Sequence, residues 1–94
     1  MKGTVIAFRE LPPRSQTTYV LHLRGKEASI IDVHLEGEGD VGCVLFTHDS
    51  KPVGKDLAPA PGCHINVTPE KTGEYSLNID NENNGVLKMT LVVQ

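Results

Sequence analysis

Short runs in which apolar and polar residues alternate recur along the chain. In the clearest of them Ile31, Val33 and Leu35 are separated by polar residues, and this period of two is typical of a strand with one buried and one solvated face. The same alternation occupies 17–24, 63–68, 74–80 and 87–93, and shorter apolar runs occupy 4–8 and 43–46. No window has the period of an amphipathic helix. The pattern predicts an all-β chain of about seven or eight short strands.

Turn-forming residues separate these runs at near-regular spacing. Pro12-Pro13, Gly25-Lys26 and 69–73 end the strands beside them, and two prolines make 58–62 a loop because proline cannot donate to a strand ladder. Such spacing is typical of a two-sheet antiparallel sandwich, jelly-roll or immunoglobulin-like, although it does not fix the connectivity. At 94 residues there is room for one such domain, over 1–94.

Neighbouring strands are predicted to pair as hairpins. The Gly25-Lys26 turn joins the strands on either side of it, with Leu21 opposite Ile31, because directly paired residues share a face. The last two strands form a second hairpin through the polar loop 81–85. We interpret 27–46 as two strands and their turn, of which the first is the strand that contains Ile31.

Composition narrows the classes of partner. The formal net charge is -3, and Lys and Arg are scattered without a run, so nothing attracts the chain to nucleic acid or anionic lipid. The first apolar run ends at Arg9, too early for a signal peptide, and no stretch approaches the roughly 18 apolar residues of a membrane helix. With two Tyr, two Phe and no Trp, the chain lacks the rings of a carbohydrate platform. A protein partner fits better.

Three segments, in the same order, resemble a known family. The strand 30–35 leads into an acidic turn and an apolar strand over 39–46, the polar turn 48–52 follows, and 73–79 contains Gly-x-Tyr-x-Leu. From about Thr17 to Val93 the chain resembles the bacterial pre-peptidase C-terminal domain. That family is a small β-sandwich module attached to secreted peptidases and other extracellular proteins.

The resemblance implies a non-catalytic accessory module that aids attachment to a protein substrate, secretion or domain stability. It implies an extracellular or periplasmic location, and it favours a domain of a longer secreted protein. The family commonly carries Asp-x-Asp at the acidic turn, and here Gly42 replaces the second acid, so no calcium role follows for Asp40. The alternative is a standalone cytoplasmic interaction or assembly domain that pairs through a strand edge. For the accessory module we expect contacts through a sheet face or the loops 36–42 and 48–61.

Cys43 and Cys63 both fall on positions that face the predicted core. A disulfide between them would link two strands across the proline-rich loop, and closing a loop of about 20 residues stabilises by about 3 kcal/mol in the chain-entropy model. The alternative is two buried free thiols that act as small hydrophobic side chains. The compartment decides between them, because disulfides persist in oxidising environments.

The histidines and cysteines do not form a recognisable metal motif. Cys63 and His64, with His34, His48 or Cys43, contain enough ligand types, but no Cys-x-x-Cys, His-x-His or His-x-x-x-His pair is present. Adjacent strand residues also point to opposite faces. Solvated histidines are the expectation, and no metal or cofactor is predicted.

Acidic residues near the 36–42 loop offer a second possible metal site. Calcium takes six to eight oxygen ligands, and the candidates are Glu36, Glu38 and Asp40, with Asp49 or Asp56. Glu36, Glu38 and Asp40 alternate with glycine, but this run of acids ends at Asp40 and is shorter than the run of ligands in a dedicated site. The alternative is a solvated acidic turn that keeps the sheet edge from pairing with neighbours.

No catalytic motif is present. The four serines lack the setting of a nucleophile elbow, no glycine-rich phosphate loop precedes a helix, and both cysteines are expected to be buried. A blue-copper site does not fit the C-terminal part of the chain, because the segment 77–80 has neither the thiolate nor the imidazole that such a site requires. Asn66-Val67-Thr68 matches a glycosylation sequon and is followed by proline. We predict that the chain is not an enzyme.

Overall fold

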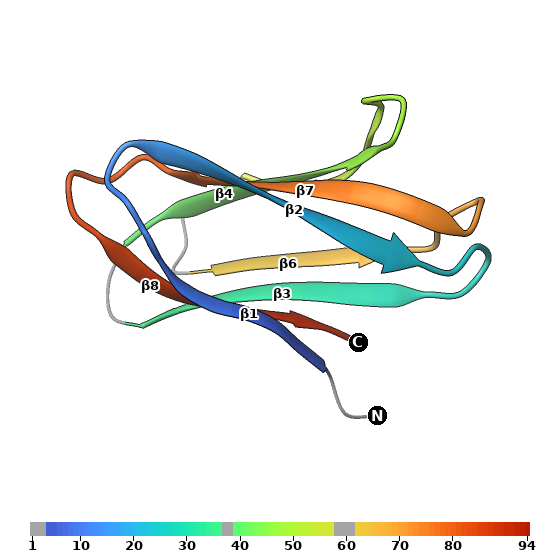
Figure 1. Ribbon diagram of the computed structural model, residues 1–94, viewed down its shortest axis with the longest axis horizontal. Helices are drawn as coiled ribbons and strands as arrows, with labels where there is room; N and C mark the ends of the chain where they lie inside the picture. The colour runs from blue at the N-terminus through green and yellow to red at the C-terminus, as the bar shows by residue number, and fades with distance from the viewer. Residues whose placement is uncertain (1–3, 37–38, 58–61) are drawn as a thin grey trace.

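The computed structural model describes residues 4–36, 39–57 and 62–94, which form two facing sheets of four strands (Figure 1). All strand pairs are antiparallel, so the predicted all-β sandwich is confirmed. No helix that could span a membrane occurs in these three ranges. The strands are β1 Thr4–Leu11, β2 Ser15–Leu23, β3 Ser29–Glu36, β4 Val41–Thr47, β5 Pro52–Asp56, β6 Gly62–Val67, β7 Gly73–Asn81 and β8 Leu87–Val93.

The strand order identifies the sandwich as a jelly roll. Sheet A has the order β1-β8-β3-β6, and sheet B has the order β2-β7-β4-β5. The pairs β1 with β8, β2 with β7, β3 with β6 and β4 with β5 are those of one long hairpin that turns back between β4 and β5. Rolling this hairpin up adds the pairs β3 with β8 and β4 with β7. This nested arrangement is the jelly-roll topology.

The predicted hairpins are wrong. Leu21 of β2 pairs with Tyr75 of β7, and Ile31 of β3 pairs with Ile65 of β6. β7 and β8 lie in different sheets, as do the two strands within 27–46, and only the β4–β5 connection stays within one sheet. Alternation determines which face of a strand is buried. It does not determine the partner, because both sheets bury the same kind of aliphatic face.

The core lies between the sheets and is mainly aliphatic, as expected. The predicted loop at 58–62 lies outside the described residues except for Gly62, which begins β6. The inward faces of the predicted strands are the buried ones. The buried apolar residues are Leu11, Leu21, Leu23, Ile31, Val33, Val41, Cys43, Leu45, Cys63, Ile65, Val67, Tyr75, Leu77, Ile79, Leu87, Met89 and Leu91.

The turns gather at the two ends of the sandwich. One end carries the β1–β2 turn and the β7–β8 loop, and the other carries the β2–β3, β4–β5 and β6–β7 turns (Figure 1). Hydrogen bonds tie Asp40 to Asn83 at the first end and Lys26 to Pro69 at the second. Of the two loop regions expected to make contacts, Asp40 therefore lies at the first end and the β4–β5 turn at the second, while the side chain of Leu57, also in the region 48–61, lies next to Gly42.

Candidate functional site

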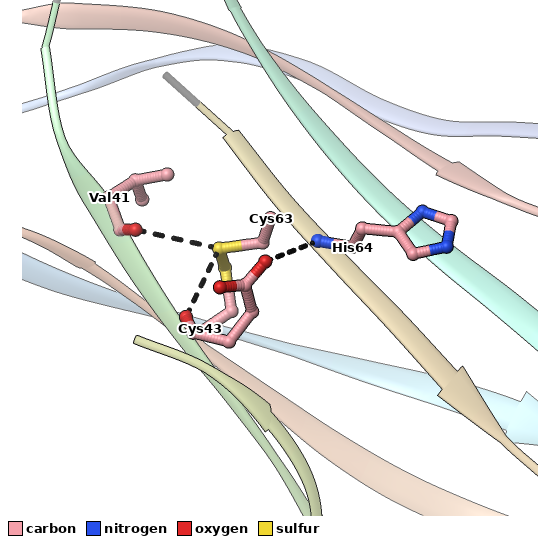
Figure 2. The surroundings of a disulfide bond; sticks show 5 residues. Val41, Cys43, Cys63 and His64 are labelled. Atoms are coloured by element: carbon pink, nitrogen blue, oxygen red, sulfur yellow. Dashed lines mark hydrogen bonds between the residues drawn. A yellow bond between two sulfur atoms is a disulfide. The ribbon is translucent and has the colours of Figure 1, made fainter. Parts of the chain in front are cut away.

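A disulfide joins the two sheets through the core (Figure 2). Cys43 in β4 and Cys63 in β6 are bonded, with Cα atoms 6.2 Å apart, and the two residues are 0% and 5% exposed. Because β4 belongs to sheet B and β6 to sheet A, the bridge connects the facing layers. Of the two alternatives that the sequence leaves open, the structure has the bridge.

Two backbone carbonyl oxygens surround the sulfur of Cys63. Its Sγ lies 3.6 Å from the oxygen of Val41 and 3.7 Å from that of Asp56 (Figure 2). A disulfide sulfur carries no proton, so these are contacts rather than hydrogen bonds while the bridge is intact. On reduction Cys63 gains an S–H group, a weak donor, with both acceptors within reach. The surroundings can therefore hold the thiol as well as the disulfide.

A chain of polar contacts connects β5, β6 and β3. A carboxylate oxygen of Asp56 accepts a hydrogen bond of 2.9 Å from the backbone N–H of His64 (Figure 2). Nδ1 of His64 lies 2.6 Å from Oδ1 of Asp32, and Nε2 lies 3.2 Å from Nδ2 of Asn66. A carboxylate oxygen accepts, so Nδ1 of His64 donates to Asp32, and in the tautomer with its ring proton on Nδ1 the Nε2 atom accepts from the Asn66 amide.

The Asp32–His64 pair has two of the three groups of a hydrolytic triad. The atom that faces Nε2 of His64, however, is the amide nitrogen of Asn66, whereas such a triad needs a hydroxyl or thiol that can act as nucleophile. The network instead holds strands together. Asp32 and His64 are directly opposite each other in the β3–β6 ladder, and Asp56 satisfies an N–H group of the edge strand β6.

The histidines and cysteines considered as metal ligands lie on different elements of the structure. Both cysteines are in the bridge, His34 is exposed on β3, and His48 is exposed in the β4–β5 turn. Glu38 lies outside the described residues. Across residues 4–36, 39–57 and 62–94, no three His, Cys, Asp or Glu side chains are grouped so that they could hold a metal ion.

The carboxylates considered for calcium form no group of three among the described residues. Glu36 is exposed at the end of β3, and Asp40 is exposed just before β4. Asp49 lies in the β4–β5 turn at the other end, where its Oδ1 is 3.1 Å from Nε2 of His48. Asp56 is engaged with the backbone of His64.

A groove of about 560 Å³ lies between the β4–β5 and β6–β7 turns. Its volume is within the usual range for ligand sites. It includes part of the 48–61 region in which the sequence analysis expected contacts. The lining residues are Thr47, His48, Asp49, Lys51, Val53, Asn66, Val67, Thr68, Pro69, Glu70, Lys71, Thr72, Gly73, Glu74 and Tyr75.

The β6–β7 turn beside this groove is fixed by three hydrogen bonds. The N–H of Lys26 donates to the carbonyl oxygen of Pro69 at 2.6 Å, and the N–H of Gly25 donates to Oγ1 of Thr72 at 2.8 Å. The hydroxyl of Tyr75 donates to the carbonyl oxygen of Lys71 at 2.7 Å. This wall of the groove is therefore held to the β2–β3 turn and to the start of β7.

The groove carries charges of both signs over an apolar lining. The exposed acids include Asp49, Glu70 and Glu74, and the exposed bases are Lys51 and Lys71. Val53, Val67, Pro69 and Tyr75 supply the apolar part of the lining. A groove of this composition suits an extended polypeptide, which offers backbone polar groups together with side chains of either charge.

Asn81 is a buried polar residue that the sequence analysis missed. It is 1% exposed and is the last residue of β7. The signal was present, because 81 continues the inward phase of Tyr75, Leu77 and Ile79. An Asn at an inward position just before a polar loop indicates a side chain that binds the backbone of the turn.

Comparison of the chain with models of known protein families gives no match, and comparison with curated proteins gives none either. The resemblance to the pre-peptidase C-terminal domain therefore stays a prediction.

Proposed function

We propose that this jelly roll is a non-catalytic accessory module of an extracellular or periplasmic protein, and that it binds an extended segment of a protein partner in the groove between the β4–β5 and β6–β7 turns. The observation that carries the proposal is the buried bridge between Cys43 and Cys63. Disulfides form and persist in oxidising compartments and are rare in the cytosol.

The position of the bridge supports a structural role. It lies in the core and connects the two sheets near one side, where β5 and β6 are the edge strands. A domain of 94 residues has a small core, and a covalent link between its layers supplements that core. Redox-active disulfides, in contrast, are typically exposed or strained.

The groove supports the choice of ligand. Binding residues are commonly found on loops that a rigid scaffold positions, and the β6–β7 turn is held in place by backbone and side-chain hydrogen bonds. The acidic and basic residues of the groove would favour one direction and one charge pattern in an extended peptide bound there.

Panning of a displayed random peptide library against the oxidised chain tests the binding role. We expect selected peptides to lose about tenfold in affinity, or about 1.4 kcal/mol, on a Lys51→Glu/Lys71→Glu variant. Lys55→Glu is the matched control, because Lys55 is exposed on β5 but outside the groove. Peptides that bind the groove variant as well as the wild type, or a library that yields no binder, would contradict this role.

The intact mass of the protein from its native source tests the compartment. Before reductant we expect a mass two protons short of the free-thiol value and no reaction with an alkylating agent, because both sulfurs are in the bridge. Alkylation of both cysteines in protein that never met reductant would place the chain in a reducing compartment. That result would favour the cytoplasmic alternative.

A further inference from the structure

The two sheets have four edge strands, and three of them are protected against pairing. β1 has an irregularity between Val5 and Ala7 and carries Arg9 and Glu10. β5 is five residues long, begins with Pro52, and has a register shift against β4. In β6 the carboxylate of Asp56 already occupies the N–H of His64. Bulges, charges, proline and short length are the devices by which proteins block sheet edges.

β2 has none of these devices. It is nine residues long and pairs with β7 in an unbroken register from Ser15 to Leu23. Its sequence contains no Lys, Arg, Asp, Glu or Pro. From the described residues, no backbone hydrogen bond outside the ladder with β7 reaches it. Its other edge faces no strand among the described residues, so backbone donors and acceptors along it are open to pairing.

We infer that β2 pairs with β2 of a second copy of this chain, antiparallel and with the two-fold axis at Tyr19, which joins the two B sheets into one sheet of eight strands. No residue of β2 lines the groove, although His22 contacts Glu74 of its lining, and the inference does not depend on the proposed function. A two-fold contact requires a surface that is complementary to itself, and the sequence of β2 meets this requirement.

The pairing about Tyr19 matches residues of compatible chemistry on both faces. On the outer face Val20 lies opposite Thr18 of the second copy, and Gln16 lies opposite His22. On the inner face Thr17 lies opposite Leu21. All nine residues pair, each stays on its own face, and no like charges meet, since β2 carries no Lys, Arg, Asp or Glu. A charged peptide gains nothing from this edge, which favours a second copy as the occupant.

Two further observations lie at the axis. The hydroxyl oxygen of Tyr19 is buried and has no hydrogen-bond partner among the described residues, so a polar group of this edge strand is unsatisfied in the single copy. Val20, next to Tyr19, is 58% exposed on the outer face. Pairing of the edges would cover part of this apolar side chain.

Sedimentation velocity of the oxidised chain from about 1 μM to about 1 mM tests the inference. We expect the mass to rise from 10.2 kDa towards twice that value, and the β2 amides to exchange more slowly with deuterium at the higher concentration. Val20→Lys places two ammonium groups on either side of the axis and should raise the dissociation constant about tenfold or more. Val53→Lys is the matched control, because Val53 is exposed on β5, the other edge of the same sheet.

The outcomes separate clearly. A wild-type dimer that Val20→Lys weakens and Val53→Lys leaves unchanged supports the inference. A chain that stays monomeric to the highest concentration overturns it, even if an extended peptide of another protein binds β2. A dimer that Val20→Lys does not affect also overturns it, because its interface is elsewhere. If Val20→Lys fails to fold, Thr18→Lys, exposed on the same face, decides by the same criterion.

Discussion

The side-chain amide of Asn81, at the end of β7, donates a hydrogen bond of 3.2 Å to the backbone carbonyl oxygen of Leu11, at the end of β1. The same nitrogen reaches the carbonyl oxygens of Pro12 and Gly85 at 2.9 and 3.1 Å. The amide oxygen accepts from the backbone N–H of Asn83 at 2.9 Å. One buried side chain thus satisfies the backbone where the β1–β2 turn meets the β7–β8 loop, and it connects a strand of sheet A with a strand of sheet B.

Replacement of Asn81 should be among the most damaging polar substitutions in the chain. Asn81→Ala removes the side-chain donor to the carbonyl oxygen of buried Leu11 and to that of Gly85, while the oxygen of Pro12 still accepts from Oγ of Ser15. We expect a loss of about 1 to 3 kcal/mol in the free energy of unfolding. Asn81→Asp should cost more, because a carboxylate in the same place would face three carbonyl oxygens. Urea unfolding with an unchanged m value measures both losses.

Asn78→Ala is the control for this prediction. Asn78 lies on the same strand, but its Oδ1 accepts a hydrogen bond from Oγ1 of Thr18 on the outer face of sheet B. Loss of an exposed hydrogen bond should change the free energy of unfolding by about 0.5 kcal/mol. Equal losses for Asn78→Ala and Asn81→Ala would show that the buried network adds no stability of its own.

The sequence was sufficient for seven of the eight strands and for their faces, but not for β5, which lies within the expected loop region 48–61, and not for the topology. The alternation of Tyr75, Leu77 and Ile79 with polar residues marks β7 and its buried side, since burial acts on each strand locally. Pairing is not local in this fold: β1 finds its partner β8 at the other end of the chain. The turn at Gly25-Lys26 suggested a hairpin, whereas it leads from one sheet to the other.

The candidate site was predictable only in part. Alternation places Cys43 and Cys63 on inward faces, which makes a bridge possible, but only the facing of β4 and β6 brings the sulfurs together. The groove depends on two turns that lie far apart in the sequence, around His48 and around Glu70. The two turns lie close together because of the rolled-up hairpin, so the groove could not be predicted from the wrong strand pairing.

The bridge between Cys43 and Cys63 should contribute about 3 kcal/mol to the free energy of unfolding, the value expected for closure of a loop of this length. We expect the oxidised chain to be the most stable form and the reduced wild type to be second. The Cys43→Ala/Cys63→Ala variant should be the least stable, because it also loses the packing of two buried sulfurs.

Urea titrations with and without reductant give this order. The double variant serves as its own control for the reductant, since it has no bridge to lose. If the reduced wild type were as stable as the oxidised form, the bridge would not stabilise the fold, and an accessory role based on it would lose its main support.

Calcium, zinc and EDTA should each leave the melting temperature of the oxidised chain unchanged, because the described residues form no cluster of metal-binding side chains. An ion that binds only the folded state adds about 2.7 kcal/mol at a concentration of 100 times its dissociation constant. For a domain of this size that would raise the melting temperature by about 10 °C or more. A rise with calcium that Asp40→Asn removes would instead identify a site at the acidic turn.

Gly54 in β5 lies so close to the core that a methyl group does not fit. A Cβ at this position would lie 2.7 Å from Cγ2 of Ile65, which is 3% exposed and has little room to move. We expect Gly54→Ala to lower the free energy of unfolding by about 1 to 3 kcal/mol, as other overpacked substitutions do. Ile65→Leu removes the branching methyl group, so the double variant should lose less than the sum of the single losses, and a double-mutant cycle measures this coupling. Gly73→Ala is the control: a Cβ there meets nothing within 4 Å, so this change should lower the free energy of unfolding by about 0.5 kcal/mol at most. Strictly additive losses for Gly54→Ala and Ile65→Leu would show that β5 moves away from β6 instead of pressing on Ile65.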